Sequence, residues 1–117
     1  MAVQSTYGGR MDSKVAGFEW DEGNRAKCQK HGVTIATIEC LFHRSLAVLP
    51  DPAHSRVEER FKAIGRTEDD RGVLIVFTLR RQGHNTFIRP VSARYMHRKE
   101  VEHYEKEAAN VEQRRGS

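Results

Sequence analysis

The stretch Val73-Leu74-Ile75-Val76-Phe77-Thr78-Leu79-Arg80 decides the fold class of this chain. Its first five residues form the longest apolar run in the sequence. Such a run, rich in β-branched residues, is typical of a central strand that is buried on both faces. The segment Gln82-Gly83-His84-Asn85 has the composition of a hairpin loop, so we expect Thr86–Arg94 to be the returning strand.

Two features of this hairpin bear on the placement of its arginines. Antiparallel pairing puts Arg80 and Arg94 at opposite ends of the hairpin, and strict alternation would place Arg89 and Arg94 on opposite faces of the sheet. Pro90 interrupts the returning strand. Because proline has no N–H to donate, the strand must lie at an edge or be bulged at that point.

The flanking sequence predicts shorter strands and three helices. Strands are expected over Phe18–Trp20, Leu46–Leu49 and Arg60–Ile64, with a polar turn over Gly65–Gly72. Asp21 can cap a helix that ends at Gly32, and Thr34 can cap a second. One apolar face of the second helix carries Ile35, Ile38, Leu41 and Phe42, and a last helix from about His97 carries Val101, Tyr104, Ala108 and Val111 on one face.

These elements predict an α+β domain, in which a small antiparallel sheet is packed with two N-terminal helices and a C-terminal helix. At 117 residues the chain is long enough for one such domain. We expect a flexible leader over residues 1–17, a single domain over residues 18–112 and a disordered tail over residues 113–117.

Composition limits the cellular setting and the cofactors. No stretch approaches the roughly 18–20 apolar residues of a membrane helix, and the N-terminus lacks the apolar region of a secretory signal, which predicts a cytoplasmic protein with no membrane partner. Cys28 and Cys40 are expected to be buried thiols. Cys28 with His31 and Cys40 with His43 repeat one spacing, but the two pairs would have to converge from separate helices. We therefore expect no metal and no cofactor.

Charge is distributed unevenly along the chain. The formal net charge is only +4, yet the segment Arg71–Lys99 contains seven Lys or Arg residues and no Asp or Glu. A block of one sign on a predicted sheet makes a positive surface that suits a polyanion. Nucleic acid and an acidic protein both remain possible partners on this pattern.

Three groups of residues are candidates for chemistry. Lys30 and His31 end the first helix and could contact phosphate or simply balance the helix dipole. His54, Glu58, Glu59 and Arg60 cluster before a strand, where a histidine and a carboxylate could move a proton or lie in a solvated loop. Arg80, Arg89 and Arg94 could bind phosphate bidentately, although Arg89 could instead pair with Glu19 or Glu59.

Taken in order, these segments resemble the BrnT toxins of type II toxin–antitoxin modules. The resemblance covers residues from Phe18 to about Glu105. It is carried by Phe18-Glu19-Trp20-Asp21, Asn24, Lys30-His31-Gly32-Val33, Asp51-Pro52, His54, Glu58-Glu59-Arg60-Phe61-Lys62-Ala63-Ile64-Gly65-Arg66, Val76-Phe77-Thr78-Leu79-Arg80, Arg89, Ser92-Ala93-Arg94, Glu100 and Tyr104. His43-Arg44, Pro90 and the basic run His97-Arg98-Lys99 depart from the family pattern.

The resemblance implies a RelE-like fold and a cytoplasmic endoribonuclease. It also implies an inhibitory partner, a BrnA-like ribbon-helix-helix antitoxin in a 2:2 complex that binds operator DNA through the antitoxin. Two alternatives stay open: a non-catalytic binding module with a basic sheet, and a degenerate toxin kept for its regulatory complex.

A metal-free ribonuclease that forms a 2′,3′-cyclic phosphate needs a base, an acid and groups that stabilise the charged phosphorane. On the resemblance, we expect Glu59 or His54 to be the base and Arg80 and Arg94 to stabilise the charge. His54 is preferred as the acid over His97 and Tyr104. The residues expected to bind the substrate are Lys30, His31, Arg60, Arg66, Arg81, Arg89 and Lys99.

Overall fold

The computed structural model describes residues 15–44, 46–54 and 57–116, and the side chains of this part except those at positions 54, 112 and 114–116. Five strands form one sheet: β1 (Gly17–Phe18), β2 (Ala47–Pro50), β3 (Arg60–Arg66), β4 (Gly72–Gln82) and β5 (Asn85–Met96). The helices are α1 (Glu22–Gln29), α2 (Ile35–Phe42) and α3 (Arg98–Gly116), with a short 3-10 turn, η2, over Pro52–His54. None of the described helices is long and apolar enough to cross a membrane.

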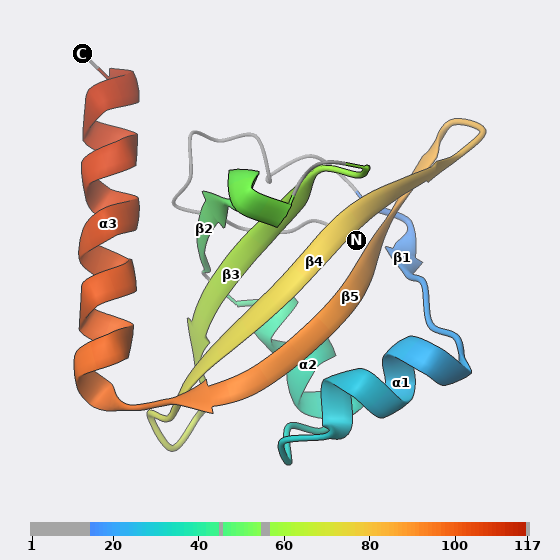
Figure 1. The fold of residues 1–117 in the computed structure, drawn as a ribbon, viewed down its shortest axis with the longest axis horizontal. Helices are drawn as coiled ribbons and strands as arrows, with labels where there is room; N and C mark the ends of the chain where they lie inside the picture. The colour runs from blue at the N-terminus through green and yellow to red at the C-terminus, as the bar shows by residue number, and fades with distance from the viewer. Residues whose placement is uncertain (1–14, 45, 55–56, 117) are drawn as a thin grey trace.

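The sheet has the order β1-β5-β4-β3-β2, so the long apolar strand β4 lies at its centre, as predicted (Figure 1). Strands β2 to β5 pair in an antiparallel meander, while the two-residue β1 pairs in parallel with β5. This arrangement confirms the α+β class and is compatible with the RelE-like fold. β3 continues to Arg66, two residues beyond the predicted end, because the backbones of Gly65 and Arg66 still pair with Val73 and Gly72 of β4.

The two N-terminal helices begin at the predicted caps. The Asp21 carboxylate accepts the Asn24 backbone N–H at 2.9 Å, and the Asn24 side chain accepts the Asp21 N–H at 2.7 Å, which together form a capping box. Thr34 caps α2 through the Thr37 N–H. Gly32 turns the chain between the helices with φ +90°, a conformation that glycine adopts without steric cost.

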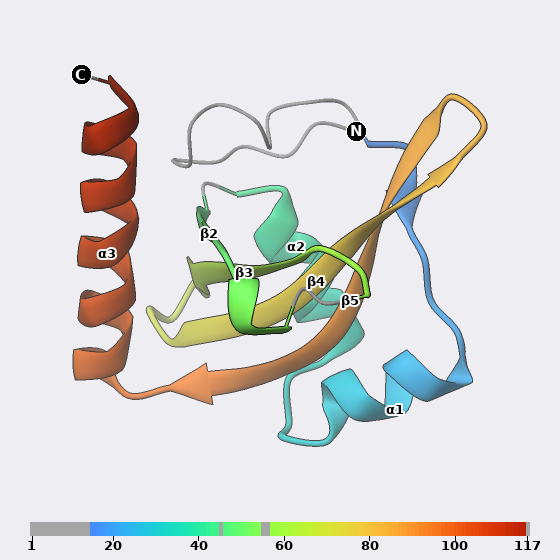
Figure 2. The same ribbon diagram turned by 45° about the horizontal axis from the view of Figure 1, so that its top comes forward.

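One face of the sheet is covered by α1 and α2 and forms the main core (Figure 2). Val73, Ile75 and Phe77 of β4 are fully buried there. Phe42 of α2 packs edge-on against Phe77, with ring centroids 5.1 Å apart. The predicted apolar stripe of α2 therefore faces the sheet.

The opposite face is covered only at one end, where α3 packs. Val101 and Ala108 of α3 form a second apolar cluster with Leu49, Ile64 and Leu74 of the sheet. Gly72 makes the close approach possible, because a Cβ atom at that position would lie 2.0 Å from a Val101 methyl group. Most other side chains on this face are polar or charged, although Val76 and Phe87 also lie there.

A β-bulge in β5 overturns the strict alternation predicted for that strand. Phe77 pairs with Pro90 and Val76 pairs with Ser92, so Val91 is an extra residue opposite no partner. The insertion shifts the phase of the following residues by one. As a result Arg89 and Arg94, which alternation would separate, lie on the same face of the sheet. The bulge thus accommodates Pro90. The pairing of β1 with β5 ends at Ile88, two residues before Pro90.

The structure also corrects the predicted ends of the domain and one cysteine. Val15 is buried in the main core and the Ala16 N–H donates to the Thr86 carbonyl at 2.7 Å, so the domain begins before Gly17. The rest of the predicted leader lies outside the described residues. α3 continues to Gly116, through most of the predicted tail. Cys28 is buried, but Cys40 is exposed because it lies on the outer face of α2.

Candidate active site

Besides Arg66, which Glu105 of α3 binds, five cationic side chains project from the face of the sheet that α1 and α2 do not cover. We call it the charged face and define it by these residues: Arg60, Lys62, Arg80, Arg89 and Arg94. Directly opposite residues of antiparallel strands share a face, and here Arg60 pairs with Thr78 and Thr78 with Arg89. The register thus places one row of three polar side chains across the middle of the sheet.

A pocket of about 840 Å³ lies over this row. We call it the arginine pocket. Its polar lining is Asp21, Asn24, Lys27, Glu58, Arg60, Thr78, Arg80 and Arg89, and its other walls are Gly23, Ala53, Val57, Pro90 and Val91. The residues come from the start of α1, the segment after η2 and the middle of β4 and β5. The pocket is therefore built by parts of the chain that are far apart in the sequence.

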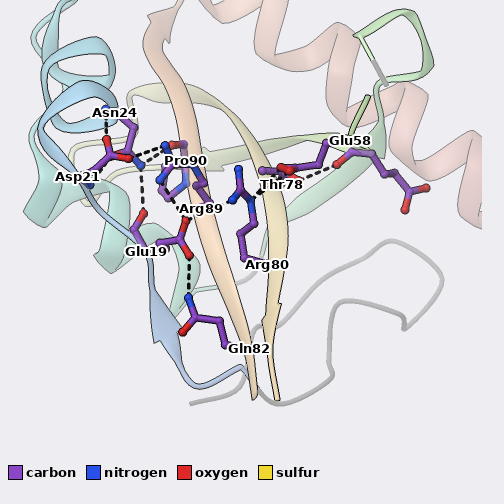
Figure 3. A network of polar contacts seen from close by, with 10 residues as sticks. Glu19, Asp21, Asn24, Glu58, Thr78, Arg80, Gln82, Arg89 and Pro90 are labelled. Carbon is purple, nitrogen blue, oxygen red and sulfur yellow. Dashed lines mark hydrogen bonds and ion pairs between the residues drawn. The ribbon is translucent and has the colours of Figure 1, made fainter. Parts of the chain in front are cut away.

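Two arginines of this pocket are held by carboxylates on three sides (Figure 3). Arg89 donates to Glu19 at 3.1 Å and to Asp21 at 2.7 Å, and its side chain is only 20% exposed. Arg80 pairs with Glu58 at 3.1 Å, and its guanidinium also approaches the Glu19 carboxylate at 3.9 Å. Glu19 thus connects the two guanidinium groups, and the predicted alternative of an Arg89–Glu19 pair is confirmed.

Asn24 fixes the wall of the pocket nearest Arg89. Its side-chain amide donates to the Glu19 carbonyl at 3.0 Å and to the Pro90 carbonyl at 2.9 Å. The Pro90 carbonyl lies beyond the stretch that β1 pairs, so the buried amide of Asn24 replaces a strand partner there. Asp21 has two roles, because the Asn24 backbone N–H and the Arg89 guanidinium both bind its carboxylate and lower its pKa.

Glu58, not Glu59, directs its carboxylate into the arginine pocket. The Thr78 hydroxyl and the Arg80 guanidinium lie beside the Glu58 carboxylate and hold its pKa below the ordinary value. The single proton of the Thr78 hydroxyl is donated to the Glu59 carbonyl at 2.9 Å, so the permanent charge of Arg80 is what keeps the pKa of Glu58 low. The side chain of Glu59 is exposed outside the pocket.

Arg94 lies away from the pocket, at the end of the face nearest α3. It pairs with Leu74, whereas Arg80 pairs with Phe87, so the two arginines are separated by about six residues of β4, roughly 20 Å. The Glu100 carboxylate binds Arg94 with both oxygens, at 3.0 and 2.6 Å. This contact raises the pKa of Arg94 and lowers that of Glu100. The structure therefore does not bring together Arg80 and Arg94, the two predicted charge stabilisers.

The other predicted site residues are divided between the pocket and the surface. Arg60 and Arg89 line the pocket. Lys30, His31, Arg81 and Lys99 are exposed elsewhere, and Arg66 binds Glu105 of α3 with two hydrogen bonds. His54 ends η2, next to Ala53 of the pocket wall, and its side chain lies outside the described residues. No group of three or more potential metal ligands occurs in the part of the chain that the structure describes.

Sequence reasoning missed Asp21, Asn24, Lys27 and Thr78 as parts of the site. The sequence predicts Asp21 as a helix cap. It does not indicate that the other carboxylate oxygen of Asp21 binds Arg89. Lys27 has no ion-pair partner among the described side chains, so its charge is available at the pocket wall. The position of α1 beside β5 brings Asp21, Asn24 and Lys27 to the pocket, whereas alternation along β4 puts Thr78 on the same face as Arg80.

Comparison with known proteins assigns the chain to a family. No curated protein matches the chain in a direct sequence search. Residues 20–100 match the family described as the ribonuclease toxin BrnT of type II toxin–antitoxin systems, and this range includes every residue that lines the arginine pocket. The chain therefore belongs to the BrnT family of ribonuclease toxins, and as a type II toxin it has an RNA target and an antitoxin partner.

Proposed function

We propose that the arginine pocket is where this ribonuclease toxin cleaves RNA. The observation that carries the proposal is the presence of two arginines and an ionised carboxylate on one concave wall. Arg80 and Arg89 present guanidinium groups that can bind two oxygens of one phosphate. Positive charge that is already in place stabilises a phosphorane without reorganisation at the moment of reaction.

We further propose that Glu58 takes the proton from the ribose 2′-OH, which then attacks the adjacent phosphate. The O–P bond to the 2′-oxygen forms and the bond to the 5′-oxygen breaks, so the products carry a 2′,3′-cyclic phosphate and a 5′-hydroxyl. His54 stays the predicted acid for the leaving oxygen. Lys27 and Arg60 would hold the flanking phosphates at the pocket wall.

The reaction is proposed to need no divalent metal. Each carboxylate at the arginine pocket is engaged by an arginine: Glu58 by Arg80, Asp21 by Arg89 and Glu19 by both. A divalent cation would have to displace guanidinium groups from these oxygens. The arginines themselves supply the positive charge that a metal would bring to the phosphate.

Glu58 and Glu59 form a matched pair of variants for testing this mechanism. Glu58→Gln removes the carboxylate inside the pocket, whereas Glu59→Gln makes the same change on an exposed neighbour. We expect Glu58→Gln to lower the single-turnover rate on a defined RNA in EDTA by about 100-fold. Glu59→Gln should cleave at the wild-type rate. Equal rates for the two variants, or 5′-phosphate ends on the products, would contradict the proposed chemistry.

We propose that the antitoxin is a BrnA-like ribbon-helix-helix protein that forms a 2:2 complex and binds operator DNA through its own domain. The charged face is the surface that suits an acidic or amphipathic segment of such a partner. The complex should protect this face. If the purified complex bound RNA as tightly as the free toxin, the antitoxin would inhibit by another route.

A further inference from the structure

The charged face continues beyond the arginine pocket in regular rows. The first row is Arg60, Thr78 and Arg89, which lie side by side on β3, β4 and β5. The next row toward α3 is Lys62, Val76 and Ser92, and the row after it is Ile64, Leu74 and Arg94. Consecutive rows are two residues apart along each strand, or about 7 Å.

Each of these rows contributes at least one cation. Arg60 and Arg89 belong to the pocket, Lys62 follows on β3 and Arg94 follows on β5. The bulge at Val91 is what brings Arg94 into this series, since an unbulged strand would direct it into the opposite face. Cations at regular intervals on one face match the charge pattern of a polynucleotide backbone.

The floor between the pocket and Arg94 is made of small residues. Val76 and Ser92 pair directly, and both are only half-buried. On the α3 side, the Tyr104 ring borders the floor, and the Lys62 ammonium group lies 5.5 Å from the ring centroid. Small residues leave room for a strand, and a half-buried aromatic ring beside a lysine is a surface on which a base can stack.

We propose that Lys62 and Arg94 form a track for single-stranded RNA, which carries the backbone from the arginine pocket as far as Arg94. The inference rests on the proposed function of the pocket. A span of roughly 20 Å from Arg80 to Arg94 is within the reach of a short extended single strand. Arg94 is then a positioning residue, and Glu100 competes with RNA for its guanidinium group.

Measurements of RNA binding and of RNA cleavage distinguish the role of the track from that of the pocket. We would measure binding of a fluorescent 12-nucleotide 2′-O-methyl oligouridylate, which has no free 2′-OH to react, at several salt concentrations. Arg94→Ala and Lys62→Ala should each weaken binding about tenfold and lower the salt slope by about 0.7. Arg98→Ala is the matched control, because Arg98 is 87% exposed on α3 and outside the charged face.

Glu100→Gln should change binding in the opposite direction. Removing the carboxylate frees the guanidinium of Arg94, so the 12-nucleotide probe should bind more tightly than it binds the wild type. A purely structural role of the Arg94–Glu100 pair would lower thermal stability in both variants and leave the salt slope unchanged. That result would overturn the track.

Two other outcomes would also overturn it. One is that Arg94→Ala and Lys62→Ala bind the probe as Arg98→Ala does while losing affinity for the antitoxin, which would make this surface a protein interface. The other is that Arg94→Ala remains slow at saturating RNA, which would place Arg94 in the chemistry. Failure of the proposed pocket gives a different result: Arg80→Ala and Arg89→Ala would cleave at the wild-type rate while the track variants still lost binding.

Discussion

The two ends of the charged face hold their arginines in different ways. At the pocket end, Arg80 and Arg89 are bound by carboxylates from β1–α1 and from the segment after η2, and Glu19 connects them. At the α3 end, Arg94 is bound by one carboxylate from the next element of the chain. The first arrangement fixes two cations around a concave space, and the second ties one cation to a helix. We propose that the first arrangement stabilises the charged transition state and that the second only positions RNA.

The largest effect is expected for Arg89→Ala. Arg89 is the least exposed of the three arginines and lies between two carboxylates at the pocket wall. Its loss should lower the single-turnover rate at saturating RNA by about 100-fold or more. Arg89→Lys should rescue little of it, because an ammonium group cannot reproduce a bidentate contact. Arg81→Ala, an exposed change of the same kind outside the pocket, is the control.

The next largest effect is expected on folding stability, when a residue that supports the arginine pocket is changed. Asn24→Ala removes a buried amide that satisfies the Glu19 and Pro90 carbonyls. We expect the free energy of unfolding to fall by about 2–3 kcal/mol, since two carbonyls lose their partner. Chemical denaturation measures this loss, with Gln29→Ala as the control, because the Gln29 side chain donates to the exposed Arg25 carbonyl. Equal stability of the two variants would contradict the role given to Asn24.

A smaller effect is expected when the α3 end alone is disturbed. Gly72→Ala would place a methyl group against Val101 and push α3 away from the sheet. The free energy of unfolding should fall by about 1–2 kcal/mol, while cleavage at saturating RNA stays at the wild-type rate. Gly17→Ala is the control, because its new methyl group would make only ordinary contact with Phe87, at 3.9 Å. A loss of cleavage in folded Gly72→Ala would show that the two ends are coupled.

The smallest effect is on stability in acid. Arg94 lowers the pKa of Glu100 in the folded chain, so the pair stabilises the fold at neutral pH and loses this contribution as the pH falls below the ordinary glutamate value of 4.5. The stability difference between wild type and Glu100→Gln should therefore shrink between pH 7 and pH 3. Unfolding at four pH values measures it, with Glu102→Gln as the control. A constant difference would mean that the pair does not titrate with folding.

Much of the fold could be predicted because its signals are local. The apolar run Val73–Phe77 identified the central strand, and the caps Asp21 and Thr34 located both N-terminal helices. The separation of Arg80 and Arg94 followed from the hairpin alone, without any knowledge of packing. These features depend on periodicity and backbone chemistry, which a sequence displays directly.

The candidate site could be predicted only in part, because its geometry depends on non-local events. Pro90 indicates an edge strand or a bulge. It does not show that Val91 is the extra residue, nor that the bulge places Arg94 on the same face as Arg89. Glu58 and Glu59 are adjacent glutamates, and the sequence does not distinguish them. The path of the chain after η2 places the Glu58 side chain in the pocket. His54 stays the predicted acid, and Glu58 takes the place of Glu59 as the proposed base.

The most direct test compares the single-turnover cleavage rates of Arg80→Ala and Arg94→Ala at saturating RNA. In the proposed mechanism, Arg80 lies at the reacting phosphate and Arg94 on the flanking strand. We therefore expect Arg80→Ala to be slower than the wild type by about 100-fold and Arg94→Ala to reach the wild-type rate once enough RNA is present. The reverse order, with Arg94→Ala slow and Arg80→Ala fast at saturation, would contradict the assignment of the active site to the arginine pocket.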